Sequence, residues 1–391
     1  MHSFDHDNGP SRTIFGTGTL SRVGSELTRA GGRRALVLST PGQRGLAARV
    51  AGLLGDGAAG IFDGAAPHTP VEVTQVALAR ARELGADSVV SIGGGSTTGL
   101  GKALSARTGM PHLVVPTTYA GSEVTSMLGE TAGGEKVTRT GPEILPRVVV
   151  YDVALTTTLS WPVTVTSAVN AMAHAVEALY APDRRAETDL LAVEGLAALA
   201  GGLRSLQHDP DDLEARDALL YGAWLAGRCL GAVTMGLHHK LCHTLGGSFG
   251  LPHAATHTVL LPHAMAYNAP AAPDALAAAA TALEVDDAPS GLQALVTALG
   301  GPTRLADLGF ALTDVPLAAT LATARPYPNP RPVERDRIVE LLTAATEGTP
   351  IHDDLGPAEV GDAATEGTPI HDDLGPAEVR TAAPDRTKEH R

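Results

Sequence analysis

The stretch Ser88-Val-Val-Ser-Ile-Gly-Gly-Gly-Ser-Thr-Thr-Gly-Leu-Gly-Lys102 decides the fold. Its first five residues are largely apolar and β-branched, which predicts a buried strand. The glycines that follow let the backbone approach a ligand, and the next helix offers free N–H groups to a pyrophosphate at its N-terminus. The alternative is a strand-to-helix turn without a ligand. We expect a dinucleotide-binding turn with contacts from Gly93, Gly94, Gly95 and Ser96.

Strand-type and helix-type segments alternate on both sides of this turn. Residues 33–40 and 112–116 predict two more buried strands, and residues 71–85 predict an amphipathic helix that ends at a glycine. This order favours a parallel sheet with helices on both faces, so we expect residues 1–155 to form a doubly wound, Rossmann-like α/β domain. Thr117 and Thr118 would lie at the same sheet edge as the glycines and bind the nicotinamide half of the cofactor, unless they only cap a turn.

The pattern changes after residue 155. Long Ala- and Leu-rich segments with helical spacing follow, for example at residues 189–200. A proline-rich segment at 325–332 interrupts these helices before a closing helix at 333–342. We expect residues 156–351 to form an all-α domain, with the ligand cleft between the two domains.

The C-terminal region carries a tandem duplication. The segment AATEGTPIHDDLGPAEV at 344–360 recurs identically at 363–379. Two short acidic copies that contain glycine and proline cannot build a core of their own. We expect residues 352–391 to be a disordered acidic tail, and the alternative is a regulatory docking segment.

Composition excludes several classes of function. The formal net charge of −14 over 391 residues disfavours binding to nucleic acid or to an anionic membrane. No apolar run reaches the roughly 20 residues that cross a bilayer, and the N-terminus lacks the basic and apolar parts of an export signal. Cys229 and Cys242 form no CxxC motif and are expected to be reduced core residues. We expect a cytoplasmic globular protein.

Two groups of polar side chains at helical spacing indicate a catalytic cleft. His239 and His243 are four residues apart, His253 follows, and Asn170 and His174 repeat the four-residue spacing upstream. Residues four apart share one face of a helix, so two helices could each direct a pair of coordinating-type side chains into one cleft. The alternatives are satisfied core histidines and a surface amide. We assign that ordinary role to the other histidines of the region: His238, His257 and His263.

Together these features resemble the iron-containing, group III alcohol dehydrogenase family over about residues 12–345. The resemblance implies a dehydroquinate synthase-like fold, an N-terminal dinucleotide-binding domain, a helical C-terminal domain, and a metal held by one aspartate and three histidines. The matching positions here are Asn170, His174, His239 and His253. A neutral amide replaces the anionic ligand, and the remaining set binds a divalent cation less well. We expect a degenerate site and no requirement for a metal.

Further segments resemble the maleylacetate reductase branch of this family. Gly99 stands where the family has an aspartate after Gly-Gly-Gly-Ser, and the segments at 35–41, 62–74, 145–152 and 324–330 match the branch. The resemblance implies reduction of the carbon–carbon double bond of maleylacetate, and of its chloro-substituted forms, to 3-oxoadipate during the breakdown of aromatic compounds. It also implies NADH or NADPH as the reductant, and a homodimer.

This chemistry fits the residues. The double bond of maleylacetate is conjugated to a ketone, so hydride delivered to the far alkene carbon pushes charge onto the ketone oxygen as an enolate. Hydrogen-bond donors or a protonated histidine can stabilise that oxygen in place of a metal. Our hypothesis is that His243 or His253 stabilises the enolate or supplies the proton, while His174 and His239 orient the substrate. The candidates for binding the carboxylates of this small dicarboxylate are Lys240, Arg325 and Lys136.

The end of the first buried strand bears on cofactor choice. NAD-specific sites usually place an acidic side chain there, which binds the ribose 2′-hydroxyl and repels a 2′-phosphate. The family's position in this chain is Thr40, directly after Ser39. We expect Ser39 and Thr40 to contact the cofactor, and both NADH and NADPH to be used.

Three rival functions stay open. A metal-dependent alcohol dehydrogenase of the same fold would use Asn170 as a neutral ligand and would need bound iron or zinc. A catalytically silent binding or scaffold protein would fail to bind a nicotinamide cofactor. A lyase on the related dehydroquinate synthase scaffold should retain the carboxylate of its metal site.

Overall fold

The computed structural model describes residues 1–132 and 135–351. The glycine-rich stretch folds as its sequence predicts, because β5 (Ser88–Gly93) runs into α4 (Gly95–Thr108) through a turn at Gly94. The neighbouring predicted elements are also present, as β3 (Ala35–Leu38), α3 (Val71–Glu83) and β6 (His112–Pro116).

Seven strands form the central sheet of the described chain, in the order β1-β2-β9-β6-β5-β3-β4. The strands not yet introduced are β1 (Phe4–Asn8), β2 (Ser11–Phe15), β4 (Ala58–Phe62) and β9 (Val148–Tyr151). β1 pairs antiparallel with β2, and the other neighbours are parallel. The chain runs from β3 out to β4 and returns across β3 to β5, so its direction reverses between β3 and β5. Doubly wound sheets bind ligands at the carboxyl ends of the strands beside such a reversal.

Helices cover both faces of the sheet, because successive residues of a strand point to opposite faces. Val37 packs on one face with α1 (Val23–Arg29) and α2 (Arg44–Leu54). Leu36, its neighbour in β3, packs on the other face with α3 and α4. The predicted doubly wound α/β architecture is therefore confirmed.

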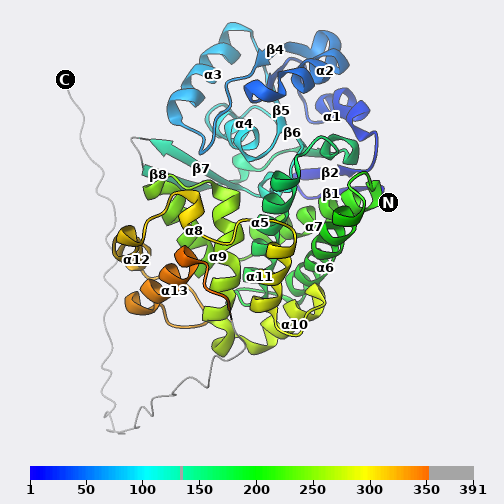
Figure 1. Ribbon diagram of the computed structural model, residues 1–391. Coiled ribbons are helices and arrows are strands. Elements are labelled where there is room, and N and C mark those ends of the chain that lie inside the picture. Colours follow the sequence, from blue (N-terminus) through cyan, green and yellow to red (C-terminus); the bar gives the residue numbers. More distant parts are fainter. Residues whose placement is uncertain (133–134, 352–391) are drawn as a thin grey trace, which may run out of the picture. The chain divides into compact units, whose positions relative to one another are not determined.

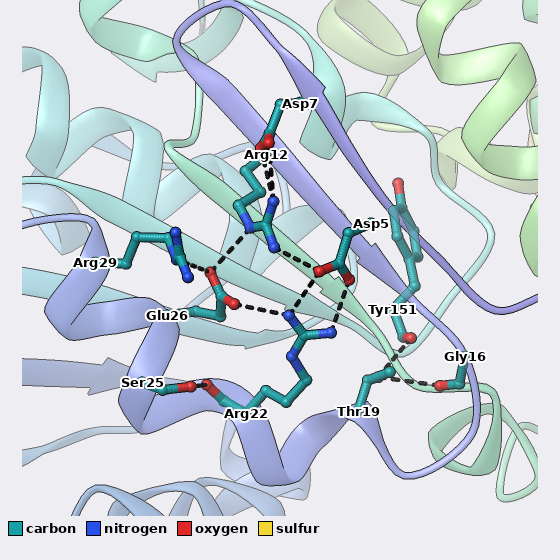
Figure 2. A network of polar contacts seen from close by, with 10 residues as sticks. All are labelled: Asp5, Asp7, Arg12, Gly16, Thr19, Arg22, Ser25, Glu26, Arg29 and Tyr151. Carbon is teal, nitrogen blue, oxygen red and sulfur yellow. Dashed lines mark hydrogen bonds and ion pairs between the residues drawn. The ribbon is translucent and has the colours of Figure 1, made fainter.

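An ion-pair network fastens the first hairpin to α1 (Figure 2). The carboxylate of Glu26 is 2% exposed and lies 3.2 Å from Arg12 Nε on β2 and 3.0 Å from Arg22 Nη2. Arg29 contacts the same carboxylate. Asp5 on β1 accepts hydrogen bonds from Arg22, and these bonds lower the pKa of the Asp5 carboxyl. The edge strand β1 is thereby held by charge as well as by backbone pairing.

The chain after β9 is helical, as the sequence predicts (Figure 1). Its helices are α5 (Trp161–Leu179), α6 (Ala186–His208), α7 (Leu213–Ala232), α8 (Leu237–Phe249), α9 (His253–Asn268), α10 (Pro273–Leu283), α11 (Ala288–Ala298), α12 (Val315–Thr323) and α13 (Arg335–Glu347). α5 is buried along most of its length and packs against α6, α7 and α9. It is the helix around which this half of the protein is built.

One hairpin was not predicted from the sequence. The segment that connects β6 to β9 in the sequence contains β7 (Met127–Ala132) and β8 (Glu135–Thr140). These two strands pair antiparallel and form a separate two-stranded sheet. The predicted proline-rich interruption at 325–332 is present and carries no helix or strand. The predicted disordered tail, residues 352–391, lies outside the described residues.

Two further expectations concern membranes and cysteines. No single helix of the described chain is long and apolar enough to cross a bilayer, and α7 and α8 meet that test only as a pair bent by 95°. Cys229 and Cys242 are buried, and neither is in a disulfide.

Candidate active site

The carboxyl ends of β3, β5 and β6 bring most of the predicted cofactor residues together. The backbone N–H of Thr117, after β6, donates to the carbonyl of Gly93 at 3.0 Å. Gln43 joins them from the turn after β3, because its amide nitrogen donates to Thr117 Oγ1 at 2.9 Å and its oxygen accepts from Thr40 Oγ1 at 3.4 Å. Sequence reasoning misses Gln43, since its role appears only when the ends of β3 and β6 are placed on the same sheet edge.

Glycine is required at two positions of the turn. Gly93 has a φ of +143°, and a Cβ atom there would lie 2.4 Å from Gln43 Oε1. A Cβ atom on Gly94 would lie 2.9 Å from Thr118 Oγ1. The first turn of α4 begins at the exposed Gly95, and its N-cap makes no side-chain hydrogen bond. An uncapped helix N-terminus that faces solvent suits a pyrophosphate.

Accessibility separates the serine and threonine residues of the predicted contact set. Thr40 and Ser96 are half-buried at the rim of the turn. Ser39 is fully buried, and its hydroxyl reaches no hydrogen-bond partner among the described residues. The fold thus brings Thr40, but not Ser39, to a surface that a cofactor can reach.

Lys102 ties the glycine-rich helix to the loop that follows β6. Its Nζ atom is buried and donates to the carbonyls of Ser122 (2.6 Å), Thr125 (2.8 Å) and Met127 (2.8 Å). Burial lowers the pKa of Lys102 to about 7, but three carbonyl acceptors need three N–H donors, which only the ammonium form supplies. Lys102 therefore holds the backbone just beyond the loop that carries Thr117.

The histidines of α5, α8 and α9 form one cluster that is layered by depth. His243 and His253 are exposed, and their stacked rings have centroids 6.2 Å apart. His174 and His239 lie deeper, at 4% and 5% exposure, with ring centroids 5.0 Å apart. The fully buried residues of the cluster are His238 and His257.

A buried carboxylate completes the cluster. Glu177, three residues after His174 on α5, has a fully buried side chain, and its Oε2 lies 2.6 Å from His239 Nδ1. His239 Nε2 in turn lies 2.9 Å from His174 Nδ1. Sequence reasoning misses Glu177, although a signal was present: it is the only charged residue in the apolar sequence of α5.

Asn170 lies at the other end of this series of contacts. Its Nδ2 is 3.4 Å from the carbonyl oxygen of Ala120 and 3.5 Å from His174 Nε2. Its Oδ1 is buried and has no hydrogen-bond partner among the described residues. Burial, followed by the neighbouring His239 ring, lowers the pKa of His174 well below its ordinary value, which favours a neutral imidazole.

The deepest layer also contains a thiol. His238, Cys242 and His257 bring possible metal-ligating atoms within 4.8 Å of one another. However, His238 Nε2 is hydrogen-bonded to His257 Nδ1 at 2.8 Å, and the other nitrogen of each ring lacks a hydrogen-bond partner in the described chain. Metal-bound histidines normally donate that outer N–H to a carboxylate or carbonyl. We interpret these three side chains as core packing, in line with the sequence expectation for His238 and His257.

A strained loop accounts for Gly99. His68 and Thr69 have φ values of +62° and +47°, and positive φ is unusual for a β-branched residue. Thr69 is buried, and a Cβ atom on Gly99 would lie 2.3 Å from its hydroxyl oxygen. The Thr69 side chain thus occupies the space that any side chain at position 99 would need.

The predicted carboxylate-binding cations differ in accessibility. Lys240 is half-buried on α8, one residue past His239, and Arg325 is exposed in the proline-rich segment. The side chain of Lys136 lies outside the described residues. None of the three is brought into the histidine cluster by a contact that the described chain shows.

Comparison with known proteins gives consistent matches. A model of iron-containing alcohol dehydrogenase matches residues 10–153, and a model of the C-terminal part of the Fe-containing alcohol dehydrogenase family matches residues 164–346. Maleylacetate reductase 1 of Rhodococcus opacus is 53% identical over 88% of this chain and 97% of its own length. Maleylacetate reductase of Rhizobium sp. (strain MTP-10005) is 55% identical over 89% of this chain and 99% of its own.

A solved structure agrees. The crystal structure of maleylacetate reductase from Agrobacterium tumefaciens superposes with a TM-score of 0.84 at 53% identity, over 90% of this chain and all of that chain. Sequence identity and fold therefore agree over nearly the full length of the relatives. The chain belongs to the iron-containing alcohol dehydrogenase family, and the relatives compared above, which are 53–55% identical to it, are named maleylacetate reductase.

Proposed function

We propose that this protein reduces the carbon–carbon double bond of maleylacetate to give 3-oxoadipate, with NADH or NADPH as the hydride donor. The proposal is carried by one observation, the layered histidine cluster whose outermost rings are exposed and whose Asn170 replaces a carboxylate. Relatives named maleylacetate reductase, 48–55% identical over 97–99% of their own length, support it.

The layering suggests which histidines meet the substrate. A nicotinamide bound at the sheet edge would supply hydride to the far alkene carbon, the electron pair of the double bond would move toward the ketone, and a proton would complete the reduction at the other carbon. The exposed His243 and His253 are the histidines of the cluster that a substrate can reach from solvent. They are our candidates for stabilising the enolate and supplying the proton, while His174 and His239 behind them orient the substrate.

The sheet edge supports use of both cofactors. The turn after β3 presents the hydroxyl of Thr40 and the amide of Gln43 and carries no acidic side chain between residues 39 and 43. Nothing in this turn repels a 2′-phosphate by charge, whereas an acidic residue there would select NADH.

The family name implies iron, and the residues present do not fit the ligand set of that family. Position 170 offers a neutral amide, and the ring nitrogens of His174 and His239 that face each other are hydrogen-bonded at 2.9 Å. Three imidazoles and an amide bind a divalent cation less well than three imidazoles and a carboxylate. We therefore propose that the reaction does not require a metal.

A substrate comparison tests this function. The full chain would be incubated with maleylacetate or with small aldehydes, in the presence of NADH or NADPH, and loss of reduced cofactor would be followed together with product analysis. We expect equal amounts of cofactor oxidised and 3-oxoadipate formed, and at most a trace rate with aldehydes. Turnover of aldehydes alone would instead indicate an alcohol dehydrogenase, and failure to bind either cofactor would indicate a silent scaffold.

A further inference from the structure

The carboxylate of Glu177 is out of reach of solvent, so water cannot solvate its charge. Its side chain is fully buried within the apolar helix α5. An ionised carboxylate in such a place is stable only when several donors surround it. The donors come from the start of α8: the backbone N–H groups of Gly236 (3.0 Å) and His238 (2.7 Å), and His239 Nδ1 (2.6 Å).

The contact with His239 fixes the tautomer of that ring. A carboxylate that receives backbone N–H groups is an acceptor, so the proton of His239 must sit on Nδ1. In the neutral ring, Nε2 is then an acceptor, and it faces His174 Nδ1 at 2.9 Å. The carboxylate thus sets the tautomer of His239 and directs its Nε2 toward His174.

The series ends at Asn170. His174 lies between two acceptors, because its Nδ1 faces His239 Nε2 at 2.9 Å and its Nε2 faces the carbonyl oxygen of Ala120 at 3.2 Å. A neutral ring has one N–H and can donate to only one of them, so these contacts fix the place of His174 and not its tautomer. Asn170 Nδ2 lies 3.5 Å from the same Nε2. The amide orientation is set independently by Ala120, whose carbonyl must face Nδ2 rather than Oδ1. The contacts therefore form one continuous series from Asn170 through His174 and His239 to Glu177. Ala120 belongs to the loop after β6, so this series joins the histidines to the cofactor edge.

We infer that Glu177 is a positioning residue of the active site, which fixes the tautomer and orientation of His239 and, through that ring, holds His174 in place. This inference rests on the proposed reduction of maleylacetate for its kinetic consequence, and on geometry alone for the tautomer of His239. Glu177 thereby places a negative charge behind His239, which lies in contact with His174.

The Glu177→Gln variant tests the inference, with Glu187→Gln as the matched control. Glu187 is an exposed carboxylate on α6 that pairs with Arg228. We expect Glu177→Gln to lower kcat by about 10–100-fold, the usual effect of removing a partner behind a ligating or reacting histidine, with little change in the KM for NADH. Glu187→Gln should match the wild type. Glu177→Asp, which keeps the carboxylate, should recover part of the lost kcat.

A second readout does not depend on turnover. Nitrogen-15 NMR of labelled histidines distinguishes a proton on Nδ1 from one on Nε2, and loss of a signal in His239→Gln assigns it. We expect His239 to carry its proton on Nδ1, in a hydrogen bond shifted far downfield that is lost in Glu177→Gln and restored in Glu177→Asp. A proton on Nε2 in the wild type, or an unchanged kcat in Glu177→Gln, would overturn the inference.

The two readouts also separate this inference from the proposed function. If the wild type does not reduce maleylacetate, the function fails, while the tautomer measurement still decides the role of Glu177. If Glu177→Gln does not fold, the wild-type spectrum and the Glu177→Asp variant remain decisive.

Discussion

At the scale of single residues, burial separates the histidines that can meet a substrate from those that cannot. His243 and His253 are exposed, His174 and His239 are nearly covered, and His257 is fully covered. The four-residue spacings place His174, His239 and His243 on helix faces, but spacing contains no information about depth. Depth is set by how α5, α8 and α9 pack, so the sequence predicts four histidines of the cluster but neither its buried members His238 and His257 nor its layers.

A buried histidine outside the cluster makes the protein acid-sensitive. Burial lowers the pKa of His263 to about 4, whereas a histidine in the unfolded chain titrates near ~6.5. Between these values the unfolded chain binds a proton that the folded chain does not. The free energy of unfolding should therefore fall as the pH drops from about 6.5 to 4, by about 1.4 kcal/mol per pH unit from this one group.

Urea unfolding at several pH values checks this. In the His263→Gln variant, the free energy of unfolding should depend less steeply on pH, by about 1.4 kcal/mol per pH unit between pH 4 and 6.5. The His208→Gln variant, which changes an exposed histidine, should keep the pH dependence of the wild type. Identical slopes in His263→Gln and the wild type would show that His263 is not kept neutral by burial.

At Gly99 the sequence shows a departure from the family pattern but not the reason for it. The cause is the Thr69 hydroxyl from a distant loop with positive φ. Glu177 and Gln43 belong to the same class, because their partners lie on other elements. Residues that act through contacts distant in sequence are the ones that sequence reasoning misses.

At the scale of elements, strongly periodic segments are predictable and exposed short strands are not. The buried strands β3, β5 and β6 and the amphipathic α3 have clear patterns and are present. The burial of β7 alternates, but its two buried residues are Leu128 and the charged Glu130, so the apolar alternation that marks a half-buried strand is absent from the sequence. The two strands are stabilised by pairing with each other, and the composition of each strand alone does not predict this pairing.

The attachment of β1 to α1 gives an element-level prediction. Glu26→Gln removes the buried charge that three arginines share, and it should lower the free energy of unfolding by ~2 kcal/mol. The expected loss is below that of a fully buried pair, because Arg22 and Arg29 reach solvent and are screened.

Thermal and urea unfolding measure this loss. Asp7→Asn is the control, because Asp7 pairs with Arg12 but its side chain is 68% exposed, and it should change the free energy of unfolding by less than about 1 kcal/mol. Equal effects of the two substitutions would mean that the network contributes nothing through burial.

At the scale of the whole molecule, two arrangements create the site. The reversal between β3 and β5 opens one sheet edge to a dinucleotide, and the buried α5 carries Asn170, His174 and Glu177 toward that edge. Ala120 links the two, since its carbonyl faces both Asn170 and His174. The α/β and helical halves follow from sequence periodicity, whereas their meeting at Ala120 is a property of the folded chain.

We propose that hydrogen-bonded histidines replace a metal in this arrangement. The kcat for maleylacetate should be measured on enzyme treated with a chelator, with its metal content determined in the same sample. We predict that kcat is retained at far less than one metal ion per chain, and that added iron or zinc does not raise it. Loss of activity together with the metal, and its return with iron or zinc, would contradict the account.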